Sequence, residues 1–311
     1  MRCKHCGFSA GPEEDEELLS DDVKKIIKCN QNVKNIVITG GEPLIHPYFF
    51  EIADYLGKNF TGKKTLMTNA TLINKSNISP IVDNFDTVSI SLDAASKDTC
   101  DYMRGQGVFE HVIDVIMMLK GNKFENISLS FVLAEVNKAE KRAFIKMCEE
   151  LQVKPMIRDF FSVGRGKINE ETLKVKELSK VVLTQNCQKY RENMRFNGDC
   201  SAGKRSLYIQ YNGDIYPCPV AAINTKFAMA KLNEIKDMDL QKIIDARENN
   251  IGYCNFYNIS PDIVEHCKEC SVKDFCWKCI QEYYTFIKNE ESREVFCKNQ
   301  REMLERIVWG D

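Results

Sequence analysis

The sequence predicts an α/β protein in two parts: a parallel sheet with surrounding helices, and a smaller cysteine-rich domain. In the first half of the 311 residues, short β-branched runs alternate with helical patterns, which is the rhythm of β-α-β units with right-handed crossovers. Beyond residue 200 this alternation stops and closely spaced cysteines replace it. We therefore expect an incomplete α/β barrel or a doubly wound sheet, with its ligand at the carboxyl ends of the strands.

Apolar, β-branched runs predict five strands, at 35–39, 65–68, 87–92, 127–133 and 154–161. Helical periodicity predicts the helices between them, at 15–28, 49–58, 108–119 and 138–151. A charged periodic segment predicts a connecting helix at 170–195. Asn212-Gly213, between apolar runs at 207–210 and 215–216, predicts a β-hairpin, and 291–309 predicts a closing helix. The expected organisation is a barrel at 1–166, a helical linker at 167–199 and a cysteine-rich domain at 200–311.

Composition excludes several classes of protein. A net charge of -2 and a pI near 6.2 give no electrostatic footprint for nucleic acid or an anionic membrane. The sequence has no apolar run long enough to span a bilayer and no visible signal peptide. Fourteen cysteines in a chain of this size indicate metal-bound thiolates in a reducing compartment rather than a disulfide scaffold. We expect a cytoplasmic protein.

The cysteines form two groups with the spacing of metal ligands. Cys3 and Cys6 open the chain as a C-x2-C pair, and residues 267–279 contain a C-x2-C-x5-C-x2-C run. Such spacing is typical of iron–sulfur clusters or zinc. Zinc ribbons usually separate their cysteine pairs by about 12–20 residues, so this tighter run favours iron–sulfur clusters. Cys100 and Cys148 fall in helical patterns and are expected to be ordinary thiols.

A glycine-rich turn follows the first predicted strand. Gly40 and Gly41 permit close approach of the backbone to a ligand, and Pro43, after Glu42, suits the first position of a helix. An ordinary strand-to-helix turn is the alternative interpretation. Because loops at the carboxyl ends of parallel strands share one edge, the cysteine pair and this turn should face one cavity.

The C-x2-C pair followed by Gly-Gly-Glu-Pro resembles the radical S-adenosylmethionine (SAM) superfamily, whose cluster motif is C-x3-C-x2-C. Its first cysteine would lie four positions before Cys3, outside this sequence, together with the first strand of a (β/α)6 barrel. The segment Ser89-Ile-Ser91-Leu-Asp93 resembles the family's fourth strand, and Arg104 follows at the family's distance. The run that ends in Gly164-Arg165-Gly166 resembles the sixth strand.

The tail resembles a SPASM domain, which carries auxiliary [4Fe–4S] clusters. The matching residues are Cys200, Gly213, Cys218, Cys267, Cys270, Cys276, Cys279 and Cys297. Two residues rather than three separate Cys276 from Cys279, which should alter the loop but keep the ligand. The resemblance implies one full site, made by Cys267, Cys270, Cys276 and Cys297. It implies a second site with Cys200, Cys218 and Cys279, whose fourth ligand it does not fix: Cys187 is preferred, Cys254 comes next, and an iron without a fourth protein ligand is the third alternative.

The resemblance also implies roles around SAM, although no catalytic residue is assigned. Cys3 and Cys6 would ligate the first cluster, and His5 would stack near the adenine. Gly40, Gly41, Glu42 and Pro43 would form the turn near the SAM amine. Ser89, Ser91, Asp93 and Arg104 would serve the ribose or carboxylate end.

The function implied by the resemblance is reductive cleavage of SAM to a 5′-deoxyadenosyl radical that modifies a ribosomally made peptide or protein. Up to three [4Fe–4S] clusters, SAM and an electron donor such as ferredoxin or flavodoxin are expected. A sulfatase-maturase-like enzyme is less favoured because Pro219, not aspartate, follows Cys218. A metal-binding scaffold without a complete SAM cluster, and a zinc-binding α/β protein, are the remaining alternatives.

Overall fold

The computed structural model describes residues 1–11, 17–175, 200–259, 263–276, 279–280 and 290–310. The chain forms two compact units. The first comprises Met1–Lys176 together with Lys236–Leu240, and the second comprises Glu177–Ile235 and Gln241–Asp311. The short segment at 236–240 thus belongs with the first unit, although sequence analysis assigned it to the cysteine-rich domain.

The first unit is built on a five-stranded parallel sheet, and the predicted α/β class is confirmed. Its strands follow chain order: β1 (Asn35–Ile38), β2 (Lys63–Thr68), β3 (Thr87–Ser91), β4 (Ile127–Leu133) and β5 (Lys154–Asp159). All five predicted strands are present, although β5 ends two residues before the predicted 161.

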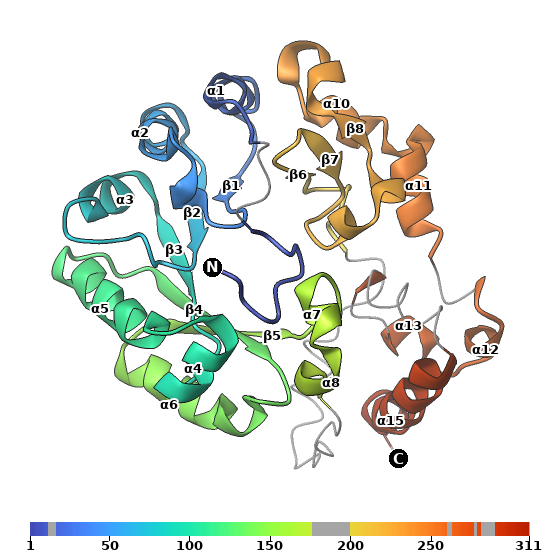
Figure 1. Cartoon of the computed structure of the whole chain (residues 1–311). Helices are drawn as coiled ribbons and strands as arrows, with labels where there is room; N and C mark the ends of the chain where they lie inside the picture. Colours follow the sequence, from blue (N-terminus) through green and yellow to red (C-terminus); the bar gives the residue numbers. More distant parts are fainter. Residues whose placement is uncertain (12–16, 176–199, 260–262, 277–278, 281–289, 311) are drawn as a thin grey trace. The chain divides into compact units, whose positions relative to one another are not determined.

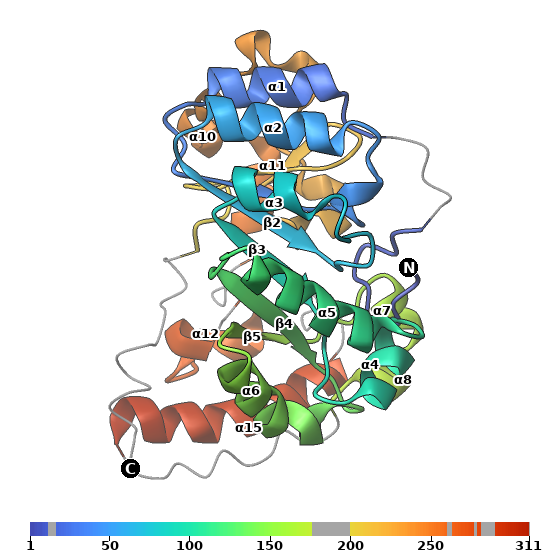
Figure 2. The same cartoon turned by 90° about the vertical axis from the view of Figure 1, so that its left-hand side faces the viewer.

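Helices cross over between the strands and cover one face of the sheet (Figure 1). The crossover helices are α2 (Phe49–Asn59), α3 (Ile78–Asn84), α5 (Val108–Gly121) and α6 (Lys141–Glu150), and α1 (Ser20–Cys29) precedes β1. Figure 2 shows α1, α2, α3 and α5 lying side by side in front of the strands. The 3-10 helices η1 (Pro43–Ile45) and η2 (Lys138–Glu140) precede α2 and α6, and α4 (Lys97–Arg104) precedes α5.

One predicted helix needs correction, and two helices were not predicted. Helix α1 begins at Ser20 rather than at 15; residues 17–19 are not helical, and residues 12–16 lie outside the described part. Helix α3 was missed because Pro80 breaks its pattern, yet proline is tolerated there because it lies in the first turn. Helix α4 was missed too, although Ser96 caps it by accepting a hydrogen bond from the Thr99 amide.

The core of the first unit lies between the sheet and these helices. On β3 the side chains alternate: Val88 and Ile90 are fully buried against the helices, while Ser89 points to the opposite face. Helix α5 contributes Val112 and Ile116, which are also fully buried. The apolar face of the sheet is therefore filled by helices, and its polar face is left for other contacts.

The second unit contains a three-stranded antiparallel sheet made of β6 (Tyr208–Ile209), β7 (Asp214–Tyr216) and β8 (Ala230–Lys231). The predicted hairpin is confirmed, with Gly213 at φ 82° in its turn. The α-helices of this unit that lie in the described residues are α10 (Gln241–Asp245), α11 (Ile251–Tyr257), α12 (Glu265–Lys268), α13 (Lys273–Cys276) and α15 (Glu290–Trp309). The last confirms the predicted closing helix.

The predicted connecting helix at 170–195 falls mostly on residues 176–199, outside the described part. Its first residues form the short helix α8 (Glu170–Leu173), which follows α7 (Arg165–Ile168) in the first unit. Of the helices that the structure describes, none combines the length and apolarity needed to cross a lipid bilayer.

Candidate cofactor site at the ends of the parallel strands

The N-terminal cysteines lie in a tight turn beside the end of α4. The Cys6 amide donates to the Cys3 carbonyl at 3.3 Å, and the Lys4 amide donates to the Met103 carbonyl at 3.0 Å. The Cys3 Sγ lies 4.0 Å from the Arg104 guanidinium Nη1. Burial raises the pKa of the Cys3 thiol, and the positive charge of Arg104 opposes this. The turn thus presents two half-buried thiols next to a fixed cation, whose positive charge partly offsets the cost of ionising Cys3 in this buried position.

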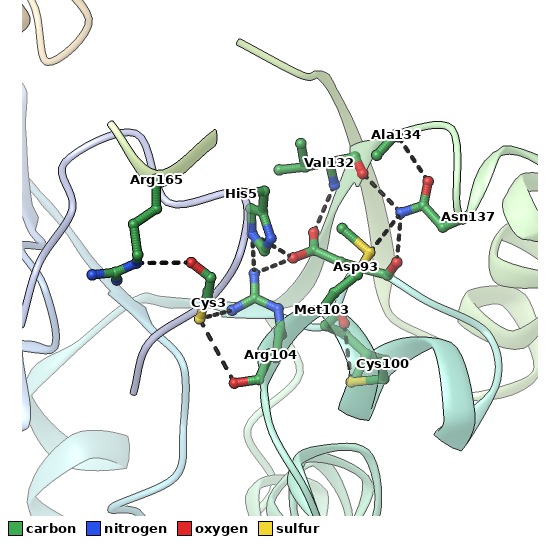
Figure 3. A network of polar contacts seen from close by, with 11 residues as sticks. Cys3, His5, Asp93, Cys100, Met103, Arg104, Val132, Ala134, Asn137 and Arg165 are labelled. Carbon is green, nitrogen blue, oxygen red and sulfur yellow. Dashed lines mark hydrogen bonds and ion pairs between the residues drawn. The ribbon is translucent and has the colours of Figure 1, made fainter. Parts of the chain in front are cut away.

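A buried ionic network joins this turn to the end of β3 (Figure 3). The carboxylate of Asp93 is fully buried, lies 2.9 Å from His5 Nε2 and forms an ion pair with Arg104. Its other oxygen accepts a 2.6 Å hydrogen bond from the Val132 amide, and its carbonyl accepts one from Asn137 at 2.7 Å. Burial by itself raises the pKa of the Asp93 carboxyl, but Arg104 and His5 lower it by more than burial raises it. The net pKa lies well below its usual range, so the carboxyl is ionised.

Asp93 adopts a left-handed backbone conformation, φ 65°, directly after the strand. This conformation is uncommon for residues other than glycine, although aspartate tolerates it better than most. Here Asn137 and Val132 hold the backbone and side chain of Asp93 in place. Sequence reasoning grouped His5, Asp93 and Arg104 as cofactor residues; the structure brings all three together, with the His5 ring and the Arg104 guanidinium both against the Asp93 carboxylate.

The Gly-Gly-Glu-Pro turn lies at the end of β1. The Glu42 carboxylate caps η1 by accepting from the Leu44 amide at 3.3 Å, and Pro43 occupies the predicted first helical turn. The same carboxylate accepts from Thr68 Oγ1 at 2.7 Å and from the Asn69 amide at 2.8 Å. Burial raises the pKa of Glu42, and these hydrogen bonds oppose the shift. Glu42 therefore ties the end of β1 to the end of β2.

The two glycines of this turn have different surroundings. A Cβ at Gly41 would lie 3.0 Å from the Cβ of Ala10, so the turn packs against the N-terminal segment. A Cβ at Gly40 would meet no atom within 4 Å. Gly40 thus exposes its backbone to open space at the edge where the cysteine turn lies, which suits the close approach of a ligand.

Serines line the polar face of the central strands. Ser89 and Ser91 on β3 pair in register with Ser128 and Ser130 on β4. Ser89, Ser128 and Ser130 are almost completely buried. Sequence analysis identified the β3 serines but missed those of β4, although the alternation in 127–130 (ISLS) carries the same signal. Small hydroxyl side chains leave space and hydrogen-bonding groups on this face.

Two buried nitrogens at the site have no hydrogen-bond partner: His5 Nδ1 and Arg104 Nε. Unpaired buried polar atoms are costly, and they indicate a place where a ligand or ion can complete the hydrogen bonding. Among the described residues, no three His, Cys, Asp or Glu side chains are arranged to hold a metal ion. The residues present fit an iron–sulfur cluster with a bound cofactor. The two thiols of one turn suit the cluster, and the adjacent cation and the two unpaired nitrogens suit a polar ligand beside it.

The tail cysteines occur in the second unit. Cys267 is buried, and Cys200, Cys218 and Cys276 pack against the same apolar cluster, which contains Tyr216 and Phe256. Burial raises the pKa of the Cys218 thiol to about 11, and the neighbouring Cys279 and Cys200 thiols contribute to this shift. Cys200, Cys218 and Cys279 are the residues that the resemblance assigns to an incomplete ligand set, and Cys218 lies close enough to the other two thiols to interact with them electrostatically.

The other predicted tail ligands and the remaining cysteines are placed as follows. Cys270 and Cys297 both interact with the charge of Arg301, so they lie in one neighbourhood. The preferred fourth ligand, Cys187, lies outside the described residues, and Cys254 donates to the Glu248 carbonyl at 3.3 Å. Cys100 and Cys148 are core thiols whose pKa values burial raises to about 12 and about 11.

Comparison with known proteins agrees with this arrangement. Residues 1–148 match the model of the radical SAM superfamily, and residues 200–271 match that of SPASM, an iron–sulfur cluster-binding domain. The chain is 26% identical over 243 residues to the mycofactocin maturase MftC of Mycobacterium tuberculosis, which covers 71% of this chain and 62% of that protein. The chain thus spans less than two thirds of the length of MftC.

Two further proteins are similar to the chain over more of its length. AlbA, the antilisterial bacteriocin subtilosin biosynthesis protein of Bacillus subtilis, is 25% identical over 338 residues, covering 99% of this chain and 70% of that protein. The crystal structure of Streptococcus suis SuiB bound to SAM superposes with a TM-score of 0.65 at 16% identity, covering 90% of this chain and 72% of that one. The SuiB likeness establishes the fold.

Proposed function

Because this chain belongs to the radical SAM superfamily and carries a SPASM domain, we propose that it is an enzyme that reductively cleaves SAM and modifies a peptide or protein. One observation carries the proposal. The cysteine turn, the Gly-Gly-Glu-Pro turn and the Asp93–Arg104 pair are far apart in sequence, but they meet at the carboxyl edge of one parallel sheet. In α/β folds this edge is where ligands bind.

The residues of the site divide the work between them. Cys3 and Cys6 would hold the first [4Fe–4S] cluster, at which SAM supplies a 5′-deoxyadenosyl radical for hydrogen abstraction. Asp93 keeps Arg104 charged and fixed, so that its guanidinium can bind an anionic group such as a carboxylate. Glu42 fixes the turn whose Gly40 backbone is open to a ligand, and the serines of β3 and β4 offer hydroxyl groups.

We further propose that the tail thiols bind two auxiliary [4Fe–4S] clusters and that the substrate is a ribosomally made peptide. Support comes from the names of MftC and AlbA, a mycofactocin maturase and a subtilosin biosynthesis protein, and from the SPASM match. The auxiliary clusters would accept the electron that the substrate radical gives up when the new bond of the product forms. A ferredoxin or flavodoxin in a reducing cytoplasm would supply electrons to the first cluster.

The decisive experiment is SAM cleavage by the full-length gene product, after anaerobic cluster reconstitution and reduction with dithionite. We expect 5′-deoxyadenosine, measured by liquid chromatography and mass spectrometry. The Cys3→Ala and Cys6→Ala variants should each abolish it while retaining iron in the tail. If iron-loaded wild-type protein yields no 5′-deoxyadenosine, the enzyme proposal fails, and a metal-binding scaffold becomes the better explanation.

The substrate can be sought among small cysteine-rich open reading frames beside the gene. Co-expression of such a peptide with the enzyme should yield a product that has lost hydrogen, as detected by high-resolution mass spectrometry. A crosslink or thioether would support a peptide maturase. Conversion of a cysteine to formylglycine would support the sulfatase-maturase alternative instead.

A further inference from the structure

The loop after β5 wraps around the cysteine turn through one arginine. Arg165 Nε donates to the Cys3 carbonyl at 3.0 Å, its Nη1 to the Ser9 carbonyl at 2.8 Å and its Nη2 to the Ala10 carbonyl at 2.7 Å. The Arg165 backbone amide donates to the Cys6 carbonyl at 2.9 Å. One residue, more than 150 positions away in sequence, thus binds four carbonyls of the segment that carries both thiols (Figure 3 shows its contact with Cys3).

The segment has few bonds of its own. Within residues 3–10, the backbone pairs that the structure describes are Cys6 to Cys3 at 3.3 Å and Ser9 to Cys6 at 3.4 Å, both long for hydrogen bonds. Ser9 also has a positive φ of 55°. A chain this short without regular structure loses considerable conformational entropy when it is fixed. The external bonds from Arg165 therefore determine much of its path.

Gly164 makes this approach possible. It adopts φ 54° and ψ -134°, and a Cβ there would lie 2.3 Å from the Gly7 carbonyl oxygen and 2.7 Å from that of Cys6. Only glycine fits such a backbone contact without moving one of the two segments. Asn169 adds one more bond, from its Nδ2 to the Lys4 carbonyl at 3.1 Å. The loop and the helix that follows it are thus shaped to the cysteine turn.

We propose that Arg165 is a positioning residue that, with Gly164 beneath the turn, pre-forms the cysteine loop before any metal binds. The planar guanidinium fork reaches three carbonyls at once, whereas a lysine ammonium is a single point of contact. The assignment of a cluster to Cys3 and Cys6 rests on the proposed function. The pre-formed loop does not, because every contact described is between protein atoms.

The test measures hydrogen–deuterium exchange of residues 3–10 in metal-free, full-length protein. We expect Arg165→Gln to accelerate exchange about tenfold or more, because local opening no longer breaks the side-chain bonds. Arg165→Lys should fall between this variant and wild type. Arg142→Gln, on the exposed surface of α6, is the matched control and should leave exchange in the loop unchanged. Unchanged exchange in a folded Arg165→Gln protein would overturn the proposal.

A second variant approaches the same loop from the backbone. Gly164→Ala should also accelerate exchange of residues 3–10, because its Cβ displaces the Gly7 and Cys6 carbonyls. Gly121→Ala is its control, since a Cβ there meets no atom within 4 Å. Exchange in the buried strands β3 and β4 reports on global folding in each variant. A loop that stays protected in Gly164→Ala while β3 and β4 remain intact would count against the proposed contact.

Iron binding links the loop to the cluster. After anaerobic reconstitution, Arg165→Gln should bind less iron than wild type. In the Cys3→Ala, Cys6→Ala background, however, adding Arg165→Gln should cause no further loss of iron. Additional loss in that background would place the effect elsewhere and contradict the assignment. If wild-type protein fails to cleave SAM while the exchange results hold, the proposed function fails and the pre-formed loop stands.

Discussion

The two cysteine-bearing regions are held by different forces. In the first unit, Cys3 and Cys6 lie in a turn fixed by hydrogen bonds and ions: Arg165 binds its carbonyls, and Arg104 and Asp93 form its buried charged neighbours. In the second unit, the thiols are themselves part of an apolar cluster. Cys267 is 7% exposed, and it packs with Tyr216 and Phe256 in a unit whose described residues form a sheet of three short strands.

This difference indicates how metal binding is linked to folding in each region. Where protein atoms outside the ligands hold the loop, the site can exist before the metal arrives. Where the ligands are packed into a small core, ligation and packing stabilise each other, and loss of metal should loosen the fold. The first unit has a large sheet core of its own, so its fold should be independent of its cluster.

Metal removal should produce the largest contrast between the two regions. On chelation of iron, we expect amide exchange to rise at least about tenfold across 200–235 and 241–276 in the second unit, because ligated thiols no longer hold its core. The strands β2 to β4 should keep their protection. The measurement is exchange mass spectrometry on reconstituted and chelated samples of one preparation. Equal protection of 200–235 and 241–276 in both samples would contradict the contrast.

Asp93→Asn should have the next largest effect, on the buried charged network of the first unit. It leaves the Arg104 guanidinium buried without a counter-charge, which costs about 3–5 kcal/mol in comparable buried pairs. We expect a clear drop in the urea midpoint of the first unit, measured through amide exchange in β3 and β4. Asp54→Asn removes only an exposed pair with Lys58, so it should cost less than about 0.5 kcal/mol.

The double variant Asp93→Asn with Arg104→Gln separates charge from packing. It should recover part of the loss, because the buried charge is removed together with its partner. If Asp93→Asn alone were as stable as wild type, the ion pair would add little to the stability of the first unit. The hydrogen bonds from Val132 and Asn137 would then be enough to hold residue 93 in place.

The sequence predicted the sheet and the main site motifs well because those signals are local. β-branched runs identify strands such as β4, and a glycine pair before Glu42-Pro43 identifies a turn. Long-range pairing carries no such signal: nothing near Arg165 indicates that it binds the carbonyl of Cys3, or that Asp93 is paired with Arg104 rather than open to a ligand. The register that aligns Ser128 with Ser89 likewise appears only in the folded sheet.

Asn30→Ala tests whether the side chain of Asn30 holds residues 236–240 in the first unit. Asn30 is 3% exposed; its Nδ2 donates to the Met238 carbonyl at 2.8 Å and its Oδ1 accepts from the Leu240 amide at 3.0 Å. Loss of these bonds should cost about 1–3 kcal/mol locally and expose residues 236–240 to exchange. Asn59→Ala removes one exposed bond and is the control. Protection of 236–240 in the variant would show that this segment does not depend on α1.

Glu42→Gln gives the smallest effect, and its sign distinguishes two carboxyls of one site, the half-buried Glu42 and the fully buried Asp93. The raised pKa of Glu42 means that the folded state holds its proton more tightly than the unfolded state, where glutamate titrates near about 4.3. Stability from this group therefore falls as pH rises above that value, and the glutamine variant should gain relative to wild type over the same rise in pH. Asp93 has a lowered pKa, so it stabilises the folded state above about pH 4, and the deficit of Asp93→Asn should shrink as pH falls below that value. Urea midpoints relative to wild type, measured from below to above about pH 4, should therefore rise with pH for Glu42→Gln and fall with pH for Asp93→Asn. Slopes of the same sign would mean that Glu42 is held as an ion pair or ligand partner, not as the cap that bridges β1 and β2.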